Sequence, residues 1–175
     1  MTGNFIDTFR THFKNGHSNL KKNYYIISTD FGKIRVFDTK ENKPVIISVP
    51  DGPNVIEHHE NLISKLSKDY RVICFEFGGI GKSYPSSKYD YSFEKSSRLI
   101  INVMDILKIG RATFCFSCSN GFYAIKTAEL FPERVNHLFL SQTPSITSMV
   151  SWTDENIPKI LRYPVIGQIA NSFSE

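Results

Sequence analysis

The sequence has no long apolar segment, few cysteines and no secretion signal. Its apolar runs fall far short of the roughly 20 residues that a membrane helix needs, so we expect no membrane span. The N-terminus has no basic segment followed by an apolar run, so no signal peptide is expected. The three cysteines, Cys74, Cys115 and Cys118, are too few for a disulfide framework and favour a reducing, cytoplasmic location.

Strong charge is also absent. The net charge is only +4, and the basic residues are spread along the chain without a stripe that alternates with aromatics, so we expect no nucleic-acid partner. What the sequence does have is apolar and aromatic content, with 41% hydrophobic residues, 14 Phe and 8 Tyr, which is enough for a buried core. The length of 175 residues suits one domain.

Strand-like and helix-like patterns alternate through the middle of the chain. Alternating strands and helices are typical of a mainly parallel sheet with helices on both faces. Two β-like runs around a short turn predict an antiparallel hairpin before this region. The sequence therefore predicts a three-layer α/β/α sandwich, with strands at 23–29, 33–38, 45–49, 71–75, 112–118 and 135–140, and helices at 55–68, 93–108 and 120–131.

The two ends of the chain differ from this α/β pattern. Apolar residues at helical spacing over 4–14 predict an N-terminal helical extension at 1–22. After the core, 23–144, the segment 145–175 is broken by prolines and predicts irregular short helices.

The stretch that indicates chemistry joins the strand at 112–118 directly to the following helix. Ser119 stands at this junction, and a serine in a sharp strand-to-helix turn presents its hydroxyl at the carboxyl edge of the sheet. Such a turn needs small residues two positions before and after, and these are Ser117 and Gly121. Because helix N-termini stabilise negative charge, Ser119 is a candidate nucleophile.

With these residues, the chain resembles the α/β-hydrolase fold family. The elbow is similar to the family's G-x-S-x-G, with Ser117 in place of the first glycine. The run from Glu76 to Ser83 resembles D-x-x-G-x-G-x-S, and 132–135 resembles the P-E-R-V before the family's sixth strand. The segment 145–175 resembles the start of the family's cap.

The resemblance implies hydrolysis of a small-molecule acyl substrate, an ester, thioester or amide, through an acyl-enzyme on Ser119. It implies no metal ion and no organic cofactor. The first oxyanion donor would be the backbone N–H of Asn120. The second would come from the loop after 45–49, where one alignment places Pro53, which has no N–H, and a shift of one residue places Gly52.

The partners that would activate the serine are missing from the sequence. In this family a carboxylate and then a histidine follow the nucleophile along the chain, but no histidine follows His137. The resemblance therefore covers only the first six strands, and the core is expected to be C-terminally truncated. An alternative is a degenerate relative that binds a ligand or partner without catalysis.

Truncation would also leave the strand at 135–140 as an exposed, apolar edge. Such edges pair with other chains, so the sequence predicts self-association.

Two local patterns have plainer interpretations. The C-x-x-C formed by Cys115 and Cys118 falls within a predicted strand and indicates buried structural thiols rather than a redox or metal site. The run 57–60, Glu-His-His-Glu, is expected on a solvated helix face, because adjacent histidines on a helix point in different directions.

Overall fold

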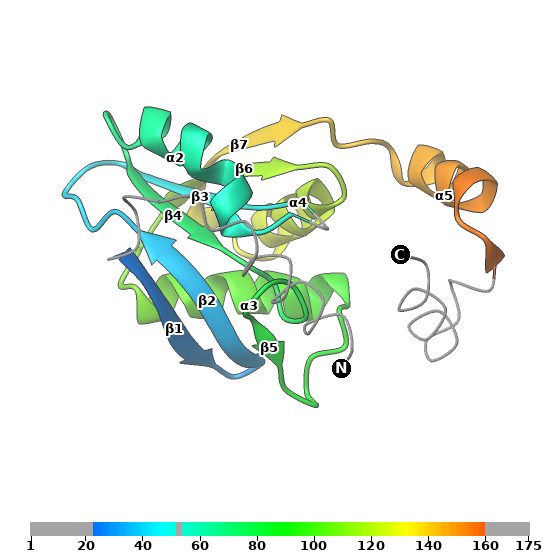
Figure 1. The fold of residues 1–175 in the computed structure, drawn as a ribbon, viewed down its shortest axis with the longest axis horizontal. Helices are drawn as coiled ribbons and strands as arrows, with labels where there is room; N and C mark the ends of the chain where they lie inside the picture. The colour runs from blue at the N-terminus through cyan, green and yellow to red at the C-terminus, as the bar shows by residue number, and fades with distance from the viewer. Residues whose placement is uncertain (1–22, 52–53, 160–175) are drawn as a thin grey trace.

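The computed structural model describes residues 23–51 and 54–159, which form one mixed sheet with helices on both faces (Figure 1). The strand order is β1-β2-β4-β3-β6-β7, and β5 pairs with β2. Strands β4, β3, β6 and β7 are parallel, whereas β1, β2 and β5 are antiparallel to their neighbours, so the predicted α/β sandwich with an N-terminal hairpin is confirmed. The strands are β1 (Tyr24–Thr29), β2 (Gly32–Asp38), β3 (Val45–Val49), β4 (Arg71–Phe75), β5 (Tyr84–Pro85), β6 (Ala112–Ser117) and β7 (Val135–Ser141).

Helices cover the two faces of the sheet unequally. On one face, α3 and α4 enclose a large core, which includes Phe114 and Phe116 of β6. On the other, η2 and α2 cover a smaller core beside Phe37 and Val72. The helical elements are η2 (Ile56–His59), α2 (Glu60–Leu66), α3 (Phe93–Ile106), α4 (Asn120–Leu130), η3 (Pro132–Arg134) and α5 (Ile146–Asn156).

The sequence of α3 explains both its start and its buried face. Ser92 precedes the helix in an extended conformation, and its hydroxyl accepts a hydrogen bond from the N–H of Lys95 at 3.3 Å. Apolar residues then recur at helical spacing and are fully buried against the sheet, namely Leu99, Ile100, Val103 and Met104.

Two elements differ from the predictions. The helix expected at 55–68 begins as a 3₁₀ turn, whose first N–H, that of Ile56, donates to the buried carboxylate of Glu76. The pairing of Tyr84 and Pro85 with β2 was not predicted, since two residues give no periodicity.

The described residues after β7 contain one short helix of the kind predicted there. This helix, α5, starts where the Ser145 hydroxyl accepts from the N–H of Ser148 at 3.0 Å. The predicted N-terminal extension at 1–22 lies outside the described residues, so the domain boundaries remain a prediction. Within the part of the chain that the structure describes, no helix is long and apolar enough to cross a membrane.

Candidate active site

The junction between β6 and α4 is a sharp turn with one residue in the left-handed conformation. That residue is Cys118, with φ of 53°. Its N–H donates to the carbonyl of Ser141 at 2.9 Å, which continues the pairing of β6 with β7, and its carbonyl accepts from the N–H of Gly121 at 3.1 Å. A non-glycine residue with positive φ is uncommon, and such strain concentrates at functional sites. Cys118 therefore occupies the apex of the elbow.

Ser119, the predicted nucleophile, lies one residue beyond this apex. Its backbone is right-handed helical, with φ of −62° and ψ of −23°, and it forms the N-cap of α4 without a side-chain capping bond. Ser117 is the last residue of β6 and pairs with Ser141. The three residues 117–119 thus bring two hydroxyls and one thiol to the carboxyl end of β6.

Gly121 is required by close packing against the segment that follows β7. A Cβ built on Gly121 would lie 2.0 Å from Oγ1 and 2.6 Å from Cγ2 of Thr143. Only glycine fits there, as the elbow motif predicts, but the need arises from contact with Thr143 and not from a positive φ at Gly121 itself.

Asn120 connects the elbow to the loop after β3 by a side-chain hydrogen bond. Its side chain is buried, and its Nδ2 donates to the carbonyl of Pro50 at 2.9 Å. The backbone N–H of Asn120 belongs to the first turn of α4, where N–H groups have no partner within the helix. Gly52 and Pro53, the other predicted oxyanion residues, lie outside the described residues. The side-chain contact between Asn120 and the loop was not predicted.

A buried carboxylate, Glu76, binds the chain where the loop after β3 ends and η2 begins. The side chain of Glu76 is 0% exposed, and its Oε1 accepts from Arg35 Nη1 at 3.1 Å and from the N–H of Ile56 at 3.2 Å. Its Oε2 accepts from the N–H of Lys82 at 2.9 Å. Burial raises the pKa of Glu76, although the charge of Arg35 acts in the opposite direction. Glu76 thus hydrogen-bonds to three separate segments, namely Arg35 of β2, Ile56 at the start of η2 and Lys82 of the loop between β4 and β5.

The run 57–60 is only in part the solvated face that the sequence suggested, since His58 is exposed but Glu57 and His59 are not. Glu57 is half-buried and receives hydrogen bonds from both terminal nitrogens of Arg35, at 2.9 and 2.5 Å. His59 is largely buried, with Nε2 3.7 Å from Oδ1 of Asp51. Burial lowers the pKa of His59, although Asp51 acts in the opposite direction. The sequence missed these contacts because both partners, Arg35 and Asp51, lie on other elements.

The described histidines lie on two elements, His58 and His59 on η2 and His137 on β7. His58 contacts Asn54 at 3.0 Å. His137 lies within β7, four residues before Ser141, which is roughly 13 Å along a strand. His137 is therefore remote from the elbow apex, because Cys118 bonds to the carbonyl of Ser141.

The cysteines differ from the expected set of buried thiols. All three are free, and Cys74 is buried, but Cys115 and Cys118 are only half-buried. Cys118 also lies beyond the end of β6, in the turn, and not within the strand. No cluster of three or more His, Cys, Asp or Glu side chains suited to a metal ion occurs in residues 23–51 and 54–159.

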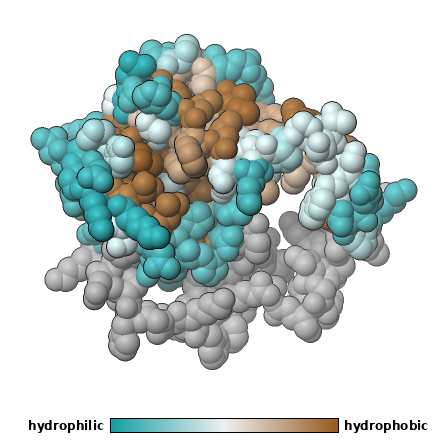
Figure 2. Space-filling model, turned by 90° about the horizontal axis from the view of Figure 1, so that it is seen from above, coloured by the Kyte–Doolittle hydropathy of each residue, from teal (hydrophilic) through white to brown (hydrophobic). Residues whose placement is uncertain are grey.

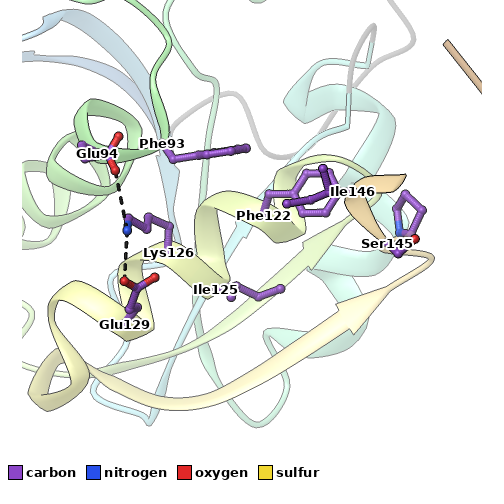
Figure 3. Close-up of a pocket in the computed structure, with 9 residues that line it drawn as sticks. Phe93, Glu94, Phe122, Ile125, Lys126, Glu129, Ser145 and Ile146 are labelled. Atoms are coloured by element: carbon purple, nitrogen blue, oxygen red, sulfur yellow. Dashed lines mark hydrogen bonds and ion pairs between the residues drawn. The ribbon is translucent and has the colours of Figure 1, made fainter. Parts of the chain in front are cut away.

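An apolar pocket of about 450 Å³ lies beside α4. Figure 3 shows the rings of Phe93 and Phe122 and the side chain of Ile146 around it, with the Lys126 ammonium between Glu94 and Glu129 at 3.6 and 3.0 Å. Phe122 belongs to the first turn of α4, so the pocket begins next to the elbow. Its lining suits an apolar group and not a highly charged one.

Comparisons with known proteins agree with this geometry. The sequence profile of the alpha/beta hydrolase fold matches residues 44–167. A hydrolase of Burkholderia vietnamiensis, named for 2-hydroxy-6-oxononadienedioate and 2-hydroxy-6-oxononatrienedioate, is 29% identical over 102 residues, which are 57% of this chain and 35% of that protein. The chain thus spans about a third of the length of this curated relative.

Two solved structures are similar to the chain. A variant of the meta-cleavage product hydrolase CumD from Pseudomonas fluorescens is 32% identical, with a TM-score of 0.60 over 65% of this chain and 43% of that one. Naproxen esterase from Bacillus subtilis shares the fold, with a TM-score of 0.70 and 18% identity over 93% of this chain and 57% of that one. The profile match, over more than half of the sequence, shows that the chain belongs to the α/β-hydrolase fold family.

Proposed function

We propose that this chain carries the nucleophile of a hydrolase that cleaves an ester, thioester or amide bond in a small-molecule substrate. The observation that carries the proposal is the left-handed apex between β6 and α4, which presents a nucleophilic side chain at a helix N-terminus. The curated relative is named for an oxo dienedioate, which contains a ketone and carboxylates but no ester, thioester or amide bond, so its name supports hydrolysis in general and not the bond that we propose.

In the proposed reaction, the nucleophile attacks the substrate carbonyl carbon, and the carbonyl oxygen becomes an oxyanion. The first N–H groups at the start of α4 stabilise this charge. The donor is the N–H of the residue after the nucleophile, which is Asn120 if Ser119 attacks, as the sequence predicts, and Ser119 if Cys118 attacks. Collapse of the intermediate expels the leaving group, which takes up a proton, and leaves an acyl-enzyme that water hydrolyses. A general base must accept the proton of the nucleophile, and the elbow residues 117–121 contain none.

Two side chains compete for the role of nucleophile. The sequence motif predicts Ser119 as the nucleophile. The backbone geometry favours Cys118, because the nucleophile of such an elbow is the residue in the strained conformation, and Cys118 is left-handed whereas Ser119 is not. A thiol is also intrinsically more nucleophilic than a hydroxyl at neutral pH.

Covalent labelling separates the two. The chain is treated with a fluorophosphonate and, separately, with a p-nitrophenyl ester, and the modified residue is located by mass spectrometry. We expect Cys118→Ala to abolish acylation by the ester and Ser119→Ala to retain it, with Cys115→Ala as the matched thiol control. Loss of labelling only in Ser119→Ala would transfer the role to Ser119. Labelling that neither substitution affects would contradict the proposed hydrolase.

The second candidate is a binding module without catalysis. The pocket beside α4 favours it, because an apolar cavity of about 450 Å³ can hold a ligand whether or not the elbow reacts. Saturable binding of an aromatic acid, lost in Phe122→Ala, together with absent acylation at the elbow, would favour this function over hydrolysis.

A further inference from the structure

Two residues with a left-handed backbone lie side by side at the carboxyl end of the sheet. Cys118 directly follows β6 and has φ of 53°, and Gln142 directly follows β7 and has φ of 56°. The two strands are parallel, and their last residues, Ser117 and Ser141, pair with each other. Neighbouring strands lie about 4.8 Å apart, so the register places the backbone of Gln142 next to the elbow apex.

The backbone around Gln142 is fixed on both sides by the elbow. Before it, the carbonyl of Ser141 accepts the N–H of Cys118 at 2.9 Å. After it, Thr143 packs against the first turn of α4, since a Cβ on Gly121 would lie 2.0 Å from Oγ1 of Thr143. A change in the backbone of Gln142 would therefore disturb at least one of these contacts.

A left-handed backbone is unfavourable for glutamine. Glycine adopts positive φ without cost, asparagine and aspartate tolerate it, and other side chains are strained there. Such strain concentrates at functional sites, where the surrounding structure maintains it. The conformation of Gln142 thus indicates a use for its side chain that glycine would not serve.

The side chain of Gln142 is available to a ligand. It is exposed, and it makes no hydrogen bond or ion pair within residues 23–51 and 54–159. Its amide offers two N–H donors and one carbonyl acceptor, all uncharged. The segments that contain the two turns, 114–125 and 138–153, have no charged residue. Because a charged ligand group would find no counter-charge in either segment, the amide suits an uncharged hydroxyl or carbonyl group.

The side of the molecule on which β7 lies agrees with an uncharged ligand. Leu138 and Phe139, which precede Gln142 on β7, have large apolar side chains. Figure 2, which views the molecule from the side on which β7 lies in Figure 1, shows an apolar patch bordered by hydrophilic residues. A substrate on this side of the elbow thus meets apolar groups, and Gln142 supplies the hydrogen bonds.

We propose that Gln142 is a specificity-determining residue of the elbow, whose amide binds a hydroxyl or carbonyl group in the acyl part of the substrate. This inference rests on the proposed hydrolase function and names its substrate class, which is an ester or thioester with an uncharged polar group close to the scissile carbonyl. β6 lies between β3 and β7. On the β3 side the amide nitrogen of Asn120 already donates to Pro50, so the free amide beside the apex is that of Gln142.

Acylation of the full chain by two matched esters tests this inference. The probes are p-nitrophenyl hydroxyacetate and p-nitrophenyl propanoate, which differ by a hydroxyl in place of a methyl group. Acylation forms the bond from Cys118 Sγ to the ester carbonyl carbon and releases p-nitrophenolate, while the thiol proton passes to the buffer. The ratio of the two acylation rates, divided by the same ratio for free cysteine, gives the preference of the elbow.

We expect the unsubstituted chain to prefer the hydroxy ester by about five-fold, the contribution of one uncharged hydrogen bond. Gln142→Gly should abolish this preference without loss of stability in urea unfolding, because glycine accepts the left-handed backbone. Gln142→Asn, which keeps an amide and tolerates this conformation, should retain part of the preference. Lys108→Gly is the matched control and should keep all of it, since Lys108 also has φ of 56° but lies after α3.

The outcomes distinguish this inference from the proposed function. Acylation at the elbow without a preference, or with one that survives Gln142→Gly, would overturn the role of Gln142 and leave the hydrolase standing. A stronger preference for the charged p-nitrophenyl hemisuccinate would overturn the uncharged substrate class. Absent acylation at the elbow of the unsubstituted chain would overturn the inference and the proposed function together.

Discussion

Gly121 and Thr143 lie in direct contact, although 22 positions separate them in the chain. A Cβ on Gly121 would approach Thr143 Oγ1 to 2.0 Å. This contact fixes the first turn of α4 against the segment that leaves β7, and the elbow apex, Cys118, is hydrogen-bonded to Ser141 at the end of β7. The shape of the elbow thus depends on the packing of two elements as well as on the local sequence of the turn.

Substitution of Gly121 by alanine should therefore destabilise the fold. We expect Gly121→Ala to lower the free energy of unfolding by about 1 to 3 kcal/mol, because the new methyl group overpacks the contact. Thr143→Ala should recover part of this loss by removing the two nearest atoms. Gly110→Ala is the control, since nothing lies within 4 Å of its Cβ position. Urea unfolding measures all three, and equal losses at Gly110 and Gly121 would contradict the explanation.

Arg35 should be the most important cation for stability. It lies between Glu57 and the fully buried Glu76, so Arg35→Met would leave a buried carboxylate without its cation. We expect a loss of about 3 to 5 kcal/mol in urea unfolding. Lys95→Met removes an ion pair with the exposed Asp90, which solvent screens, and should have a much smaller effect. Similar losses in the two variants would show that burial of the Arg35 cluster is not decisive.

The ion pair of Asp38 with Arg71 should make the free energy of unfolding depend on pH in the acid range. Burial acts to raise the pKa of Asp38, but hydrogen bonds from Arg71 and from the N–H of Lys40 more than offset it and hold the pKa below its usual value. A carboxylate with a lowered pKa stabilises the fold above its unfolded pKa of about 4 and ceases to do so as the pH falls through its folded pKa.

Asp38→Asn should thus be less stable than the unsubstituted chain at pH 7, and the difference should shrink below about pH 4. Urea unfolding of the variant and of the unsubstituted chain at several pH values, from about 2.5 to 7, measures this difference across the range in which carboxyl groups ionise. Asp69→Asn, at an exposed position, should leave the profile unchanged. A difference that stays constant with pH would rule out the ion pair as its source.

The three thiols should react at different rates. Burial raises the pKa of Cys74 to about 12, so its reactive thiolate is scarce and inaccessible in the folded chain. We expect a disulfide reagent at pH 8 to modify Cys118 first, Cys115 more slowly because burial also raises its pKa, and Cys74 only after denaturant is added. Native modification of all three, located by mass spectrometry, would show that the region around Cys74 opens readily.

Much of the fold could be predicted because buried parallel strands are continuous apolar runs. The strands at 45–49 and 71–75 have the predicted bounds, and the helix at 93–108 differs only by ending at Ile106. β5 could not be predicted, because its pairing depends on a strand from another part of the chain, and the apolar pattern did not distinguish the 3₁₀ turn at Ile56 from a regular helix. The same limit applies to Glu57, whose burial requires Arg35 from β2.

By itself, the sequence determined the family, the strand-to-helix junction at 117–121 and the small residues that such a turn requires, because these depend on local pattern and spacing. The tertiary structure decided which residue takes the left-handed position. The bond from Cys118 to Ser141 and the contact of Gly121 with Thr143 place the apex at Cys118, one residue before Ser119. Pairing between distant strands sets that register, and no local pattern contains it.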